Sequence, residues 1–560
     1  MLRFFIIFLA ASWTFCANAA KLDDLPAPQG RTELYGLNSP VTQVQNLLKT
    51  LGRYHGRIDG FMGSDLERAI RLYEKEHGLT QTGRVSHELI IHLDHVGRIR
   101  ALINRLEDVR HNRREAARQA LLSDPRTRNL LQQKDRKAAD PTLDQSRCLK
   151  KPDSTCLLRA AVETSRAIYE NDMRDWALGE ILAAQVSVGQ EEDALKTAAR
   201  IKDSRLIIAA LTNIAKTHAR DGKIEEALSS LDLIPLTERR LSVLLEIAGF
   251  YRNKNRLIDL DQVLHNIVAG ADGLGSVKES LSIQINAARL LASVDKKRAL
   301  NVLNQLSQQV VIATQDGVQN SLMRQIADTI AKIGYPEQAL QAIEKLPDDN
   351  TRIPVLMAAS RSFAHLSRFD EAKKTIKQIH AKRYRSVALS DLATTLWEGR
   401  QQIEALDLLE QAVVIAKKVH LPFARNFALS HIAHSLIKIV TTTQEPQHAE
   451  RALNVLHHIS DARLKARGLW NLAHATRQSR VQIDQAQYDK TATSAMQAVK
   501  SSFSRAWILG DLVEYYQGIG DQTQAKRAFN LGLNTVKKLK NPWARSRALA
   551  KFATLAHRFD

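Results

Sequence analysis

What the sequence lacks excludes several kinds of chemistry. It contains no Ser-His-Gly-Cys run, no H-E-x-x-H, no C-x-x-C spacing and no nucleic-acid-binding module. Ser293-Val294-Asp295-Lys296 satisfies S-x-x-K, but no Lys-Thr-Gly partner accompanies it, and so short a pattern often occurs by chance. We therefore predict a protein without catalytic residues or cofactor and without a nucleic-acid partner.

Histidines are numerous, but none sits in a zinc-binding pattern. His92 with His95, His431 with His434, and His457-His458 are the closest pairs, and no cysteine pair supports them. Histidines scattered through helical segments are usually surface or packing residues. The sequence therefore predicts no metal site.

Long hydrophobic runs are also missing after the first twenty residues, where no stretch of eighteen uncharged apolar residues occurs. The first twenty residues have the pattern of a signal peptide: Arg3, the apolar run 4–11, and the cleavage motif Ala17-Asn18-Ala19. Cys16 lacks the small preceding residues of a lipoprotein signal. We expect an exported protein, periplasmic or associated with the cell envelope, with 21–38 as an extended tether.

The full sequence is strongly basic. Lys and Arg number 80 against 60 for Asp and Glu, which gives a net charge of +20. This excess favours an anionic partner such as wall carboxylates or lipid headgroups, although charges spread over many helices are usually solvated. The composition is compatible with peripheral membrane contact but does not predict it.

Residues 51–83 form the most informative stretch. Ser39-Pro40 is a good helix start, Asp59-Gly60 is a tight-turn dipeptide, and Ser64 with Glu67 has the spacing of a capping box. Gly78 suits a left-handed helix C-cap, and Leu89, Ile90 and Leu93 have helical spacing. We predict three short helices within 39–97.

Residues 41–93 resemble the type-1 peptidoglycan-binding domain. The residues that match its pattern are Val41, Leu47, Leu48, Leu51-Gly52, Tyr54, Gly56, Asp59-Gly60, Gly63, Ala69-Ile70, Tyr73, Gly78-Leu79 and Thr82-Gly83. The sequence departs from the pattern at Leu66, where the family has Thr, and at Tyr73-Glu74, where it has Phe-Gln. Because most matched residues are turn glycines and core residues, the resemblance supports the fold more than the affinity.

The resemblance implies binding of a glycan or a stem peptide near the glycine-rich loop. Its motif residues here are Tyr54, His55, Arg57, Asp59, Gly60 and Gly63, of which the first four are the candidate contacts. The alternative is a retained fold with another function, since fold alone does not fix function.

A basic segment, 98–165, separates this domain from the rest of the chain. Between Arg98 and Lys150, fourteen Lys or Arg stand against seven Asp or Glu, and apolar residues recur at helical spacing from Ile99 to Val109. We predict a basic helical connector, which either rests on the wall or membrane surface or serves as a soluble spacer. Cys148 and Cys156 are expected to form a structural disulfide, with a reactive thiol as the alternative.

From about residue 166 the chain repeats itself every 33 residues, and later every 40. Segments such as 210–215, 388–393 and 428–433 are each followed by a second amphipathic stretch. This predicts about ten helical pairs plus a terminal helix over 166–560, an α-solenoid. The units resemble tetratricopeptide repeats, because Leu211, Ala215, Gly222 and Ala227 have that family's spacing, although its Trp and Tyr are mostly missing. The predicted fold class is therefore all-α.

Five basic residues recur at intervals of forty: Arg385, Arg425, Lys465, Arg505 and Arg545. Stacked repeats would align them as a basic ladder that binds an acidic peptide or glycan. The alternative is that each basic side chain pairs with a carboxylate of a neighbouring repeat unit or packs its aliphatic stem between units.

These predictions combine into an exported, non-catalytic scaffold that holds peptidoglycan through the small domain and an envelope protein or peptide through the repeat groove. Two weak contacts would then act together through effective concentration. The alternatives are a wall-remodelling enzyme with an unrecognised site, or an interaction scaffold that does not bind the wall.

Overall fold

A computed structural model describes residues 39–132, 139, 146–344 and 346–559, and the predicted signal peptide and tether lie outside this range. The described residues form 27 helices and contain no strand. The predicted all-α class is therefore confirmed. By its internal contacts the chain divides into a unit of residues 1–116 and a unit of residues 117–560.

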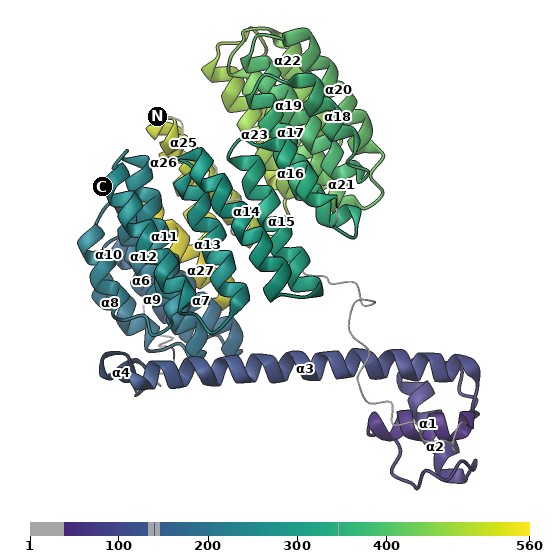
Figure 1. The fold of residues 1–560 in the computed structure, drawn as a ribbon. Coiled ribbons are helices and arrows are strands. Elements are labelled where there is room, and N and C mark those ends of the chain that lie inside the picture. Colours follow the sequence, from purple (N-terminus) through teal and green to yellow (C-terminus); the bar gives the residue numbers. More distant parts are fainter. Residues whose placement is uncertain (1–38, 133–138, 140–145, 345, 560) are drawn as a thin grey trace. The chain divides into compact units, whose positions relative to one another are not determined.

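The first unit is built on α1 (Pro40–Thr50), α2 (Ser64–Glu76) and the beginning of α3 (His87–Ser123) (Figure 1). Ser39 caps α1 by accepting a hydrogen bond from the Thr42 amide at 3.1 Å. The capping box expected between Ser64 and Glu67 is wrong: the N-cap of α2 is Gly63, which makes no side-chain cap, and Glu67 pairs with Arg71 at 2.9 Å.

Apolar side chains from the three helices form the core of this unit. Val44, Leu48, Ile70 and Leu93 are fully buried. Positive φ angles occur where the sequence supplies glycine, including 67° at Gly78 directly after the C-cap of α2. Helical periodicity and turn glycines therefore account for the local fold of this unit.

Helix α3 is a single helix of 37 residues. The sequence analysis placed a domain boundary between residues 97 and 98, but the helix continues through Gly97, and Asp94 pairs with Arg98 across it. No proline occurs between Pro40 and Pro125. The third helix of the small domain and the basic helix are thus one element.

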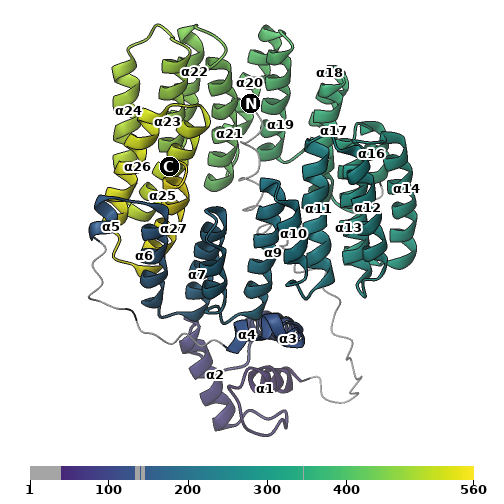
Figure 2. The same ribbon diagram turned by 90° about the vertical axis from the view of Figure 1, so that its left-hand side faces the viewer.

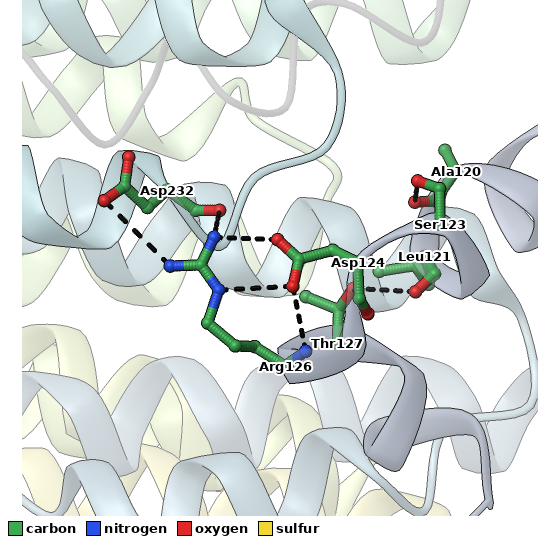
Figure 3. A network of polar contacts seen from close by, with 7 residues as sticks. All are labelled: Ala120, Leu121, Ser123, Asp124, Arg126, Thr127 and Asp232. Atoms are coloured by element: carbon green, nitrogen blue, oxygen red, sulfur yellow. Dashed lines mark hydrogen bonds and ion pairs between the residues drawn. The ribbon is translucent and has the colours of Figure 1, made fainter.

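The carboxyl end of α3 is anchored within the second unit (Figure 3). Leu121 is fully buried, and its carbonyl accepts a hydrogen bond from the Thr127 hydroxyl at 2.7 Å. At the start of α4 (Pro125–Gln132), Arg126 pairs with Asp124 at 2.7 Å and donates to the Asp232 carbonyl at 2.8 Å. These contacts turn the chain and tie α4 to the end of α10 (Ile224–Leu231).

The rest of the second unit is a helical repeat array. Ten consecutive pairs run from α7 to α26, and α27 follows. The first helices of the pairs, with α27, are α7 (Asn171–Ser187), α9 (Ser204–Asp221), α11 (Thr237–Asn253), α13 (Val277–Leu291), α15 (Asp316–Lys332), α17 (Asp349–His365), α19 (Lys382–Glu398), α21 (Pro422–Val440), α23 (Ala462–Gln478), α25 (Ser502–Gly518) and α27 (Pro542–Ala556). The second helices are α8 (Glu191–Ala198), α10, α12 (Leu257–Asp272), α14 (Lys296–Ala313), α16 (Pro336–Ile343), α18 (Phe369–Lys377), α20 (Gln402–Lys417), α22 (Pro446–His457), α24 (Gln485–Ala498) and α26 (Gln522–Lys537).

The array closes on itself. Each first helix packs on the first helix of the next pair, and α27 packs on α7, so these eleven helices form a complete circuit. In the described residues no second helix follows α27, and α6 (Ser154–Arg166) packs against it (Figure 2). The preceding α5 (Ser146–Lys150) contacts α6. α6, which the sequence analysis assigned to the connector, therefore completes the last repeat.

One buried arginine holds the junction between α7 and α27. Arg547 is 8% exposed, and its guanidinium donates two hydrogen bonds of 2.7 Å to the Glu180 carboxylate. Four aromatic rings surround the guanidinium, at 4.7, 5.3, 5.2 and 4.4 Å from their centroids: Trp176, Phe503, Trp507 and Trp543. Cation–π contacts and a bidentate ion pair thus act at the same point.

Candidate functional site

The loop between α1 and α2 is organised by one buried glutamine. Gln45 has no exposed surface; its amide nitrogen donates to Asp59 Oδ1 at 2.7 Å and to the Phe61 carbonyl at 3.2 Å. Its amide oxygen accepts from the backbone N–H groups of Asp59 and Gly60 at 3.1 and 2.9 Å. Every polar atom of this side chain is therefore used to fix the loop.

Asp59 is part of the same arrangement. Hydrogen bonds, first from Gln45 and then from the Phe61 amide, lower the pKa of Asp59 below its usual value. Gly60 has a φ of 75°. A Cβ at this position would lie 3.0 Å from the Thr42 hydroxyl oxygen. Both residues of the Asp-Gly turn thus have a structural task in the loop.

Tyr54 lies in the core rather than on the surface. The residue is 7% exposed, and its hydroxyl donates to the Arg57 carbonyl at 2.9 Å. A Cβ at Gly56 would lie 2.3 Å from the Tyr54 hydroxyl oxygen, which explains the glycine at this position. The geometry favours a supporting role for Tyr54, and its direct contact with a ligand stays a prediction.

The exposed part of the loop consists of other residues. His55, Arg57 and Gly63 are exposed, as are Phe61 and Met62, with exposed fractions of 76% and 44%. The sequence analysis did not select Phe61 or Met62, although an aromatic residue directly after an Asp-Gly turn was a usable signal. The loop can therefore offer an imidazole, a guanidinium and an exposed aromatic face on one rigid backbone.

Both departures from the domain pattern are accommodated by new contacts. Leu66 is 1% exposed in the core. Glu74 is buried, and its carboxylate accepts hydrogen bonds from the Thr82 hydroxyl at 2.6 Å and the Gly83 amide at 2.9 Å. The carboxylate therefore ties α2 to the following turn and does not alter an exposed helix face.

Tyr73 stands where the domain pattern has Phe, directly before Glu74. Its hydroxyl lies 2.9 Å from His92 Nδ1, and its ring stacks on His77 at 4.0 Å between centroids. Burial raises the pKa of Tyr73. Desolvation, together with His77 and His95, lowers the pKa of His92, so this polar contact joins two neutral side chains at neutral pH.

The basic ladder of the array consists of half-buried side chains on successive first helices. Arg385 donates to the Lys377 carbonyl at 3.0 Å, Arg425 to the Val419 carbonyl at 3.4 Å, and Arg505 to the Ser502 hydroxyl at 3.3 Å. These contacts give the arginines a local structural role. Binding of an acidic partner by Arg385, Arg425, Lys465, Arg505 and Arg545 stays a prediction.

Earlier repeats use arginine in the same way. Arg174 donates to the Ile168 carbonyl at 3.4 Å, and Arg352 to the Leu346 carbonyl at 3.0 Å, in each case six residues back along the chain. The sequence analysis missed these two because the repeat length differs there. The shared function is to tie the start of a helix to the turn that precedes it.

Cys148 and Cys156 are joined in a disulfide, with their Cα atoms 5.6 Å apart. The bond links α5 to the first turn of α6, next to Asp153, which caps α6. It therefore lies where the amino-terminal part of the array meets its last helix.

The histidine pairs lie in different settings. His431 contacts Asp391 at 2.7 Å, whereas His434 is exposed. Within the described ranges, no group of three or more His, Cys, Asp or Glu side chains is placed to hold a metal ion. Among the described helices, none is long and apolar enough to cross a membrane.

Comparison with known families agrees with this architecture. Residues 38–93 match the peptidoglycan binding domain family, and residues 386–422 match a tetratricopeptide repeat family. Both resemblances are confirmed, in the predicted order along the chain. The chain thus carries a peptidoglycan-binding-type domain followed by tetratricopeptide-like repeats.

Whole-chain similarity is weak. No curated protein matches the chain. Among solved structures, the crystal structure of Ton1535 from Thermococcus onnurineus NA1 is 16% identical, covering 59% of this chain and 96% of its own, with a TM-score of 0.27. A circular tandem repeat protein with novel repeat topology and enhanced subunit contact surfaces is 13% identical, covering 92% and 94%, with a TM-score of 0.13. Scores this low support no argument about this chain.

Proposed function

We propose that this protein is an exported, non-catalytic scaffold that binds peptidoglycan through its small domain and an envelope protein through its repeat array. The observation that carries the proposal is the match of residues 38–93 to the peptidoglycan binding domain, on a described fold with a rigid, exposed loop. Localisation to the cell wall follows from that activity, and export from the pattern of the first twenty residues.

The loop suits a glycan that carries a stem peptide. Phe61 offers an apolar face for a sugar ring, and Arg57 offers a guanidinium for a carboxylate. Gln45 fixes the backbone between them, so little conformational entropy is lost on binding. Glycan contact through His55, Arg57 and Phe61 is our specific proposal.

The array supplies the second binding function. Tetratricopeptide-like repeats present extended helical surfaces, and such surfaces commonly bind proteins or peptides. Because the first helices form a closed circuit, a partner must approach the array at an edge or an outer face, or enter along the axis of the circuit. This replaces the open groove expected from a linear solenoid.

The test is calorimetric binding of soluble disaccharide-peptide fragments of peptidoglycan to the full chain. The triple variant His55→Ala, Arg57→Ala, Phe61→Ala should lose at least about tenfold in affinity, the effect of roughly 1.4 kcal/mol. The matched control is Leu72→Ala, Lys75→Ala, Arg84→Ala, which alters exposed residues of the same domain away from the loop. Equal affinities of both variants would refute the assignment of the loop.

A further inference from the structure

Helix α3 carries an exposed apolar stripe that nothing in the described structure covers. Ile99, Ile103, Leu106 and Val109 are 39, 48, 56 and 41% exposed. Their spacing of four, three and three residues puts them on one side of the helix, with the half-buried Leu102 among them. Contiguous exposed apolar surface on a soluble protein usually marks a contact site.

The charges around the stripe are distributed unevenly. Residues 98–114 contain six arginines and two acidic residues. Arg110 and Arg113 lie seven residues beyond Ile103 and Leu106, so they continue the same face. In the described part of the chain, neither arginine makes a hydrogen bond or an ion pair.

Three acidic residues lie on the other side, whereas Glu107 follows Ile103 by four residues and lies beside the stripe. Asp108 and Glu115 follow Ile99 and Leu106 by nine residues, and Asp94 precedes Ile103 by nine. Nine residues are two and a half turns of an α-helix, which places each carboxylate opposite the stripe. The apolar face of the helix therefore carries Arg110 and Arg113 with one carboxylate, Glu107, at its edge, and the other three carboxylates lie on the opposite face.

This distribution disfavours a second copy of the chain as the occupant. If Ile99, Leu102, Leu106 and Val109 formed the seam of a parallel coiled coil, Arg105 of one helix would face Arg110 of the other. Neither arginine has a neutralising partner among the described residues. Two like charges would therefore flank the seam.

We propose that residues 98–113 of α3 form a contact surface for an anionic lipid bilayer. In that arrangement the stripe enters the headgroup boundary, the arginine stems lie along it, and the guanidinium groups reach the lipid phosphates. Each arginine near such a surface contributes to binding in a salt-dependent way. This activity goes beyond wall binding, and it would place the small domain between the membrane and the wall.

The test is co-sedimentation with vesicles, using protein that begins at Ala20 because the apolar run 4–11 would itself bind lipid. Vesicles of phosphatidylglycerol and phosphatidylethanolamine are compared with vesicles of phosphatidylcholine alone. We expect binding to the anionic vesicles only, weakened at least about tenfold by Ile103→Asp with Leu106→Asp, and likewise by Arg105→Glu, Arg110→Glu, Arg113→Glu.

Matched controls make the same kinds of substitution at exposed positions of the repeat array. Ile258→Asp with Ile403→Asp replaces residues that are 86 and 90% exposed, and Lys278→Glu, Lys296→Glu, Lys297→Glu changes the net charge equally at exposed positions. Both controls should bind vesicles as the unaltered protein does. Circular dichroism of the α3 variants shows whether the helix content is kept.

Three results would overturn the proposal. The α3 variants and the controls could bind equally, or the unaltered protein could bind no anionic vesicle. Alternatively, the stripe could bind a synthetic acidic heptad peptide while vesicles are ignored, which would assign it to a protein partner. None of these results bears on glycan binding by the loop, because the loop residues are unchanged.

Discussion

At the scale of single residues, the small domain depends on side chains that support its loop rather than on those that face solvent. Gln45 makes four hydrogen bonds to Asp59, Gly60 and Phe61 from a fully buried position. Truncation would leave backbone N–H groups without a partner, which costs about 1–3 kcal/mol.

We therefore expect Gln45→Ala to speed amide hydrogen exchange at Asp59 and Gly60 by about tenfold or more in the full chain, as a loss of roughly 2 kcal/mol implies. Gln43→Ala is the matched control, since Gln43 is exposed on the same helix. Unchanged exchange at both amides in Gln45→Ala would show that the loop holds its conformation without this side chain.

The Gln45 contacts also show the limit of sequence reasoning in this domain. Turn glycines and apolar periodicity predicted the three helices, because those are local properties. The Gln45 to Asp59 contact joins residues fourteen apart and depends on how α1 meets the loop. For the same reason the burial of Tyr54, a candidate ligand contact, could not be predicted.

A buried histidine makes the array sensitive to acid. His474 is 5% exposed between Tyr515 and Tyr516, with ring centroids at 5.1 and 5.0 Å. Desolvation is the main cause that lowers the pKa of His474; Asp521 opposes it and Arg477 adds to it. The unfolded chain then binds a proton more readily than the folded chain, so stability falls as the pH drops below about 6.5.

We expect the melting temperature of the array to fall less between pH 7.5 and pH 5 in His474→Phe than in the unaltered protein. Phenylalanine keeps the aromatic contacts, and neither ring nitrogen of His474 has a hydrogen-bond partner in the described structure. Parallel pH profiles for the two proteins would contradict a role for this histidine.

At the scale of elements, α6 belongs to the array. Leu158 of α6 is 1% exposed in a cluster that includes Leu549 and Phe552 of α27. If α6 completes the last repeat, Leu158→Ala should lower the stability of the array by about 2–5 kcal/mol, like any buried leucine.

Leu303→Ala is the comparison, because Leu303 is fully buried within the array, on α14. Denaturant unfolding followed by circular dichroism measures both variants. If Leu158→Ala has a negligible effect on stability and Leu303→Ala a large one, α6 belongs to the connector and not to the array.

The ion pair at the closure gives an independent prediction. Arg547→Met removes a guanidinium that is bonded twice to Glu180 and enclosed by aromatic rings. We expect a loss of about 2–4 kcal/mol, since a partly buried carboxylate stays behind. Arg558→Met, at an exposed position beyond α27, is the control, and equal melting temperatures would show that the closure does not depend on this pair.

At the scale of the whole molecule, closure is what the sequence could not predict. Repeat periodicity describes how each unit contacts the next, and it correctly indicated a helical array. The contact between Arg547 and Glu180 joins residues 367 apart and depends on the curvature summed over all repeats. For this reason Arg547 and the surrounding aromatic rings were not recognised as a group.

The closed circuit of first helices also affects how the array and the small domain could bind their ligands together. A closed array has no free terminal repeat in its circuit, so partner binding should depend on the exposed surface and not on the ends. The small domain and the array are separate compact units, which lets each bind its own ligand. The proposed scaffold needs both activities on one chain.

The most direct test of this account is pelleting with purified peptidoglycan sacculi. Protein beginning at Ala20 is compared with the same protein lacking 39–86, at low and moderate salt, beside tubes without sacculi. The account predicts pelleting that persists at moderate salt and is lost with the small domain. Equal pelleting of both proteins that disappears with salt would contradict it, since the excess of basic residues would then explain the binding.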